Sequence, residues 1–193
     1  ETGMFFDEME KFGKNILMTD GKKHVFTYAD AADYARQLGM QAEKRSVVLC
    51  LCENTVGSIA GYLGFLHNRV IPLLLDEKTD ISFLQQIIET YEPEYLYVPE
   101  KREADYPDYK VKYKAYGYAL LKTGYEAEKK PYEELALLLT TSGSTGSPKL
   151  VRQSYRNLEA NAESIVEYLQ IDEKQRAITV LPMNYTYGLS VIN

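Results

Sequence analysis

The sequence predicts an α/β fold, in which a mostly parallel sheet carries helices on both faces. Three observations lead to this prediction. Segments typical of strands and of helices alternate along most of the chain, the order that builds a parallel sheet. The main strand-like segments are almost continuously apolar, as expected for strands that are buried on both sides. The helix-like segments carry apolar residues at helical spacing, so each has a face that can pack on the sheet.

The size and composition of the chain bound its function. The 193 residues weigh 22.1 kDa and are 45% hydrophobic, which is enough apolar material for a core and excludes intrinsic disorder. The net charge of −6 and a pI near 5.1 argue against nucleic acid as the main partner. The longest apolar runs, 47–52 and 135–139, are far shorter than the roughly 20 residues of a membrane span.

The elements follow one another from the N-terminus. Residues 15–19 and 23–27 flank an Asp-Gly turn and predict a short hairpin. The spacing of Thr27 and Asp30 fits a capping box, which starts a helix that continues to about Glu43. The apolar strands predicted beyond it are 46–52, 69–75 and 95–98. The helices between them are 81–90 and an earlier one that follows Asn54 or Thr55 as a cap and ends near His67.

The helix predicted over 55–67 carries three glycines, at positions 57, 61 and 64. A dinucleotide-binding fingerprint also contains three glycines, but at a different spacing and in the turn before the helix. The glycines therefore predict close packing of this helix against the sheet.

The two cysteines, Cys50 and Cys52, are two residues apart on a predicted strand and share one face. This is a poor geometry for a mutual disulfide. Neither histidine lies at metal-ligand spacing from them, and two thiolates do not complete a zinc site. We interpret them as buried free thiols, typical of a reducing compartment, and expect a cytoplasmic protein.

The stretch 99–131 combines many charges with many of the 17 tyrosines, and predicts an irregular connection with edge strands. Basic residues interleaved with tyrosines also occur in proteins that stack single-stranded nucleic acid. Acidic residues are mixed into the same stretch, which favours edge strands over a nucleic-acid surface.

The most informative segment follows a buried strand predicted over 135–140. It reads Thr141-Ser142-Gly143-Ser144-Thr145-Gly146-Ser147-Pro148-Lys149. The two glycines permit turns in which successive N–H groups point into one concavity, and the hydroxyl groups add donors around it. Residues 142–157 contain three positive charges and no acid, although the whole chain is acidic. The segment therefore predicts a phosphate-binding loop, with Lys149 as a mobile charge.

Two other kinds of segment have a related composition. A flexible linker has a similar composition, but here the segment lies between a buried strand and an amphipathic helix predicted from Ser154 onward. The P-loop of nucleoside triphosphatases requires Gly-Lys followed by Ser or Thr. This segment places Pro148 before the lysine and Leu150 after it.

Residues 141–149 resemble the Thr-Ser-Gly-Ser-Thr-Gly-x-Pro-Lys signature of the AMP-forming adenylate ligases, which include acyl-CoA synthetases and nonribosomal peptide adenylation domains. Residues 181–188, Leu-Pro-Met-Asn-Tyr-Thr-Tyr-Gly, are similar to the family segment that places a His or an aromatic residue beside the acyl pocket. Phe26-Thr27-Tyr28 resembles the opening segment of such enzymes. Leu150 replaces a usual glycine, and the family often has a histidine near the position of Tyr155, differences that indicate a divergent branch.

The resemblance implies a two-step ligase. A carboxylate attacks the α-phosphorus of ATP, pyrophosphate leaves, and the acyl-adenylate passes to a thiol or an amine, with the thiol of CoA or of a carrier protein as the expected acceptor. Lys149 would be catalytic and would offset charge on the leaving pyrophosphate, and Tyr185 would shape the entry of the carboxylate substrate. The phosphates would be held by Thr141, Ser142, Gly143, Ser144, Thr145 and Gly146.

We interpret residues 1–3, which precede Met4, as a remnant of cloning, and expect residues 4–193 to form one α/β domain, the N-terminal part of a longer ligase. By the resemblance, the residues that bind adenine and ribose, the Mg²⁺ ligand and a further catalytic lysine would lie beyond the chain, so the chain alone is expected to be inactive. Two other hypotheses remain open: a stand-alone nucleotide- or phosphate-binding module or pseudo-enzyme without chemistry, and an assembly protein built on the same sheet.

Overall fold

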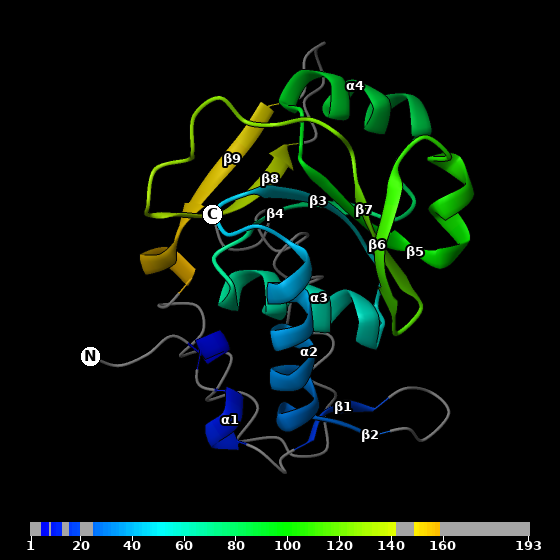
Figure 1. Cartoon of the computed structure of the whole chain (residues 1–193). Coiled ribbons are helices and arrows are strands. Elements are labelled where there is room, and N and C mark those ends of the chain that lie inside the picture. The colour runs from blue at the N-terminus through cyan, green and yellow to red at the C-terminus, as the bar shows by residue number, and fades with distance from the viewer. Residues whose placement is uncertain (1–4, 8, 13–15, 20–24, 142–148, 159–193) are drawn as a thin grey trace.

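The computed structural model describes residues 5–7, 9–12, 16–19, 25–141 and 149–158. Its centre is a seven-stranded sheet in the order β6-β7-β5-β3-β4-β8-β9 (Figure 1). The strands are β3 (Val47–Cys52), β4 (Ile71–Asp76), β5 (Tyr95–Pro99), β6 (Lys110–Ala115), β7 (Tyr118–Lys122), β8 (Leu135–Thr141) and β9 (Lys149–Ser154). The four central strands are parallel, and antiparallel strands flank them on both sides. The predicted α/β fold is confirmed, with a parallel centre and antiparallel edges.

Helices cover both faces of this sheet (Figure 1). One core contains α2 (Tyr28–Gln41), α3 (Val56–His67) and one set of strand side chains, and the other contains α4 (Ile81–Tyr91) and the opposite set. The chain runs from β3 through α3 to β4 and then returns through α4 to β5, on the other side of β3. The order of the strands thus reverses at β3. In open α/β sheets, ligands bind outside the carboxyl ends of the strands at such a reversal.

The N-terminal elements pack outside this frame. The predicted hairpin is present as β1 (Ile16–Thr19) and β2 (Val25–Thr27), which pair antiparallel. The capping box is confirmed: the Thr27 N–H donates to Asp30 Oδ2 at 2.9 Å, and the Asp30 N–H donates to Thr27 Oγ1 at 3.1 Å. The helix that it starts, α2, ends at Gln41, close to the predicted boundary. Two short elements precede the hairpin, η1 (Phe5–Asp7) and α1 (Met9–Phe12).

The glycines of α3 lie at close contacts, as predicted. A β-carbon at Gly61 would overlap ring carbons of Tyr97 and lie 2.7 Å from its hydroxyl oxygen. A β-carbon at Gly64 would lie 2.7 Å from a terminal methyl of Leu38 in α2. A β-carbon at Gly57 would likewise overlap the Tyr116 carbonyl and lie 2.7 Å from the Tyr118 ring, so all three glycines let α3 approach its neighbours at distances that a side chain would prevent.

The tyrosine-rich stretch contains the predicted edge strands. β6 forms one edge of the sheet, and β7 lies between β6 and β5. A short 3₁₀ helix, η2 (Glu100–Asp105), precedes them, in place of the irregular connection expected there. The tyrosines of the 99–131 stretch pack against other aromatic rings. Tyr116 meets Tyr34 edge to face with ring centroids 5.0 Å apart, and Tyr106 stacks on Tyr109 with centroids 5.8 Å apart.

Candidate functional site

The predicted phosphate loop joins two paired strands. β8 and β9 are antiparallel, and Thr141 at the end of β8 is the register partner of Lys149 at the start of β9. β8 also runs parallel to β4, with Leu74 and Leu139 as register partners. The loop therefore begins and ends at the carboxyl edge of the parallel strands, the edge at which open α/β sheets bind ligands, two strands from the reversal at β3.

The expectation that Lys149 belongs to a mobile loop is wrong. It is the first residue of β9, a strand that the sequence did not predict, and it is exposed to solvent. The backbone of Lys149 is fixed by the pairing of β9 with β8, so its charge projects from a defined position on the sheet. The helix expected from Ser154 onward begins at Tyr155 in the described part of the chain.

Most of the other predicted site residues lie outside the described residues. These are Ser142, Gly143, Ser144, Thr145 and Gly146 of the loop, and Tyr185 of the 181–188 segment. Thr141 and Lys149 are the two predicted positions that the structure places, and it brings them together.

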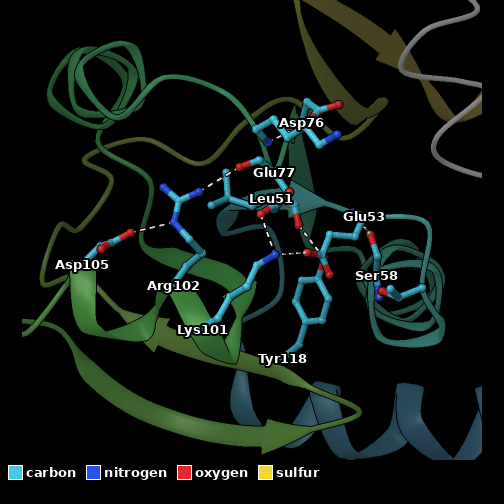
Figure 2. A network of polar contacts seen from close by, with 11 residues as sticks. Leu51, Glu53, Ser58, Asp76, Glu77, Lys101, Arg102, Asp105 and Tyr118 are labelled. Atoms are coloured by element: carbon cyan, nitrogen blue, oxygen red, sulfur yellow. Dashed lines mark hydrogen bonds and ion pairs between the residues drawn. The ribbon is translucent and has the colours of Figure 1, made fainter.

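A network of charged side chains lies at the carboxyl ends of the central strands (Figure 2). Lys101 Nζ lies 3.0 Å from Glu53 Oε1 and 2.8 Å from Glu77 Oε1. Glu53 follows β3, Glu77 follows β4, and Lys101 follows β5. Hydrogen bonds to Glu77 and then to Glu53 raise the pKa of Lys101, so its ammonium group stays charged.

Further polar contacts fix this edge (Figure 2). Arg102 donates from Nε to Asp105 at 2.6 Å and from Nη1 to the Glu77 carbonyl at 2.8 Å. Tyr118 donates its hydroxyl proton to the Leu51 carbonyl at 2.7 Å. The contacts join the ends of β3, β4, β5 and β7, and β4 is the strand beside β8. The network therefore braces the edge from which the predicted loop departs.

Sequence reasoning missed this network. Glu53 and Glu77 directly follow β3 and β4, and Lys101 comes two residues after the end of β5; these positions just after strands are the signal that could have identified them. Their proximity depends on the strand order, which brings β3 beside both β4 and β5. One ammonium group shared by two carboxylates leaves one net negative charge in this cluster, and we interpret the contacts as structural links between the strand ends.

The cysteines are buried as predicted. Cys50 and Cys52 are both free thiols, each 3% exposed, on the face of β3 that packs against α2 and α3. Burial raises the pKa of both, that of Cys52 to about 12, so neither is a thiolate near neutral pH. Within the described ranges, no group of three or more His, Cys, Asp or Glu side chains is placed to hold a metal ion.

A hollow of about 270 Å³ opens at the opposite, amino-terminal end of the strands, beside Ser46, Tyr95 and Lys122. Its wall alternates acidic and basic side chains, so it offers no field of one sign. Among the helices that the structure describes, none is long and apolar enough to cross a bilayer.

A family model described as "AMP-binding enzyme" matches residues 5–193. Over 58 residues, the chain is 41% identical to a putative ligase, Rv1013, of Mycobacterium tuberculosis, a match that covers 30% of this chain and 11% of that protein. Over 60 residues, it is 38% identical to 2-succinylbenzoate–CoA ligase of Staphylococcus aureus, covering 31% and 12%.

Solved structures share the fold. The O-succinylbenzoate coenzyme A synthetase MenE from Bacillus subtilis, in complex with AMP, superposes with a TM-score of 0.60 at 16% identity. The superposition covers 86% of this chain and 45% of that chain. The chain thus spans about half the length of this neighbour.

Proposed function

Because this chain belongs to the family of AMP-binding enzymes, we propose that it forms the N-terminal part of an AMP-forming ligase that uses ATP to activate a carboxylate. The observation that carries this proposal is the position of the 141–149 segment. A sequence rich in hydroxyl groups and glycine joins β8 to β9 at the carboxyl edge of the parallel strands, and it ends in Lys149. This is where open α/β sheets bind ligands and where phosphate-binding chemistry is useful.

We assign the loop to the leaving group. Backbone N–H groups at Gly143 and Gly146 would hold the β- and γ-phosphates, together with the hydroxyl groups of the segment. Those hydroxyl groups belong to Thr141, Ser142, Ser144 and Thr145. Lys149 would stabilise the negative charge that develops as pyrophosphate departs, and donors aimed at developing charge are a large source of rate enhancement.

The proposed first step balances as a substitution at phosphorus. A carboxylate oxygen bonds to the α-phosphorus, the bond from that phosphorus to the bridging oxygen breaks, and pyrophosphate keeps the electron pair. Tyr185 would border the path of the carboxylate. Mg²⁺ would neutralise phosphate charge when bound, and we expect its protein ligand in sequence beyond residue 193.

In the second step, a thiol would attack the acyl carbonyl and AMP would leave. The proposed acceptor is the thiol of CoA or of a carrier protein, and the names of similar proteins, which include CoA ligases, support CoA. We also propose a cytoplasmic location, because Cys50 and Cys52 are free thiols and reducing compartments keep thiols in this state.

The test is carboxylate-dependent exchange of labelled pyrophosphate into ATP by the complete natural protein. We expect exchange with the complete protein and none with the 193-residue chain alone. A complete protein that binds ATP but shows no exchange with any of a broad panel of carboxylates would instead be a nucleotide-binding module. Clear turnover by the 193-residue chain would overturn its assignment as an incomplete enzyme.

A further inference from the structure

A buried tyrosine lies directly after β9, at the end of the strand opposite Lys149. Tyr155 is 6% exposed, and its N–H donates to the Glu134 carbonyl at 3.0 Å. Its hydroxyl oxygen accepts a hydrogen bond from Arg45 Nη1 at 2.8 Å. Burial raises the pKa of Tyr155 although Arg45 and Arg69 oppose the shift, so the phenol stays neutral.

Two guanidinium groups contact the ring of Tyr155. The central carbon of Arg69 lies 4.8 Å from the ring centroid, and that of Arg45 lies 5.8 Å from it. Both distances are within the range of cation–π attraction. The ring is therefore held by two cations as well as by its hydroxyl group.

Arg45 connects Tyr155 to the start of β8. Its Nη2 donates to the carbonyls of Tyr132 at 2.7 Å and Leu135 at 2.9 Å. Leu135 is the first residue of β8, and Arg45 itself lies just before β3. One guanidinium group thus holds the open end of the β8–β9 hairpin against the central sheet.

Arg69 is fixed in turn by the N-terminal segment. It lies just before β4, and its backbone carbonyl accepts from the Arg45 N–H at 2.8 Å. Its guanidinium group donates to both carboxylate oxygens of Asp7, at 3.2 and 2.8 Å, and lies 5.4 Å from the ring centroid of Phe6. Both arginines are therefore also held by contacts with residues other than Tyr155.

The register of β9 needs such an anchor. The pairing of β8 with β9 is irregular between Leu135 and Leu137, next to the open end of the hairpin. Successive side chains of a strand point to opposite faces, so a slip of one residue would move Lys149 to the other face of the sheet. A contact that fixes the far end of β9 prevents this slip. The strand is extended and only six residues long, so fixing one end also fixes the position of the other.

We propose that Tyr155, held by Arg45 and Arg69, is a positioning residue that fixes the register of β9 and thereby the place of Lys149 beside Thr141. The inference rests on the proposed function of Lys149 at the leaving pyrophosphate. It adds a residue at the end of β9 that controls the position of Lys149 at the start of the same strand.

The test is a double-mutant cycle in the complete protein, with kcat and the KM for ATP measured by pyrophosphate exchange. Rates are referred to the folded fraction, which denaturant unfolding provides for each variant. We expect Tyr155→Leu to lower kcat about tenfold or more. The double variant Lys149→Ala/Tyr155→Leu should have the same kcat as Lys149→Ala alone, within about twofold, because both substitutions act through Lys149. Tyr155→Phe keeps the ring and its cation–π contacts but loses the hydrogen bond from Arg45, so it should fall between wild type and Tyr155→Leu.

Tyr132→Leu is the matched control, because its side chain is 54% exposed and only its backbone carbonyl meets Arg45. It should leave kcat unchanged. If Lys149→Ala leaves exchange intact, the proposed role of Lys149 fails and the inference with it. If Lys149→Ala slows exchange but the two substitutions act multiplicatively, or Tyr155→Leu has no effect on folded enzyme, only the inference fails. Should Tyr155→Leu not fold, Tyr155→Phe in the same cycle decides in the same way.

Discussion

Thr141 and Lys149 are register partners across β8 and β9, so the two ends of the predicted phosphate loop lie side by side. The pairing fixes the backbone of the lysine, and the side chain remains exposed. A cation whose backbone is fixed by strand pairing can meet an anion at this edge at a lower entropic cost than a cation on a moving loop. This relationship leads to the first prediction.

Lys149→Ala in the complete protein should lower kcat for pyrophosphate exchange roughly 10²-fold, the usual effect of removing one donor to developing charge. Because the side chain is exposed, the denaturant midpoint should stay the same. Lys110→Ala is the control: Lys110 is exposed on β6, at the opposite edge of the sheet, and its replacement should leave the rate unchanged. Equal rates for wild type and Lys149→Ala would contradict the assignment.

The buried elements of the fold could be predicted because local sequence determines them. The apolar runs of β3 and β4 and the capping box at Thr27 are local signals, because a few neighbouring residues are enough to identify each of them. β9 could not be predicted in this way. Its sequence, KLVRQS, does not alternate regularly, and its burial is partial, since it is stabilised by pairing with β8 rather than by its own apolar face.

The candidate site was predictable only where one segment carries the chemistry. The hydroxyl- and glycine-rich stretch after β8 can be recognised as a candidate phosphate-binding loop from its own composition. The contacts of Lys101 with Glu53 and Glu77 join residues 48 and 24 positions apart (101 − 53 and 101 − 77), which only the strand order brings together. The same holds for Tyr155 and Arg45, at a separation of 110 residues.

The close contact of α3 with the sheet leads to a second prediction. Gly61→Ala should lower the free energy of unfolding by about 1–3 kcal/mol, because the new methyl group would overlap the ring of Tyr97, which is 1% exposed and cannot move aside freely. This loss would come in spite of the higher helix propensity of alanine, worth about 1 kcal/mol. Urea unfolding measures the difference.

Gly64→Ala is the matched comparison on the same helix. Its methyl group would meet the end of the flexible Leu38 side chain, which can give way more easily than an aromatic ring. We expect a smaller loss than for Gly61→Ala. The reverse order of the two variants would show that α3 packs differently from this description.

The buried thiols lead to a third prediction. Cys50 and Cys52 are each 3% exposed, and their raised pKa values keep them protonated. A thiol reagent such as dithionitrobenzoate should therefore label neither in the native 193-residue chain, and both after denaturation. Labelling in dilute denaturant should proceed at the rate of unfolding. Rapid native labelling of one thiol would show that the core under α2 and α3 is open at that position.

The contacts of Asp7 predict how stability depends on pH. Burial acts to raise the pKa of Asp7, but hydrogen bonds and charge from His67 and Arg69 outweigh it, and the pKa is lowered from the ordinary value of 3.8. The folded state therefore binds fewer protons than the unfolded state in acid. The stabilisation is present above the unfolded pKa, near 3.8, and is lost as the pH falls through the lower folded pKa.

Asp7→Asn removes this titration and leaves a side chain of similar size beside Arg69. We expect the variant to be less stable than the wild-type chain at pH 6 and the difference to shrink as the pH falls below about 4, as urea unfolding at each pH would measure. Asp108→Asn, at an exposed carboxylate, is the control and should follow the wild-type curve. A difference that stays constant between pH 6 and pH 3 would mean that Asp7 contributes through packing against Arg69 and not through its charge.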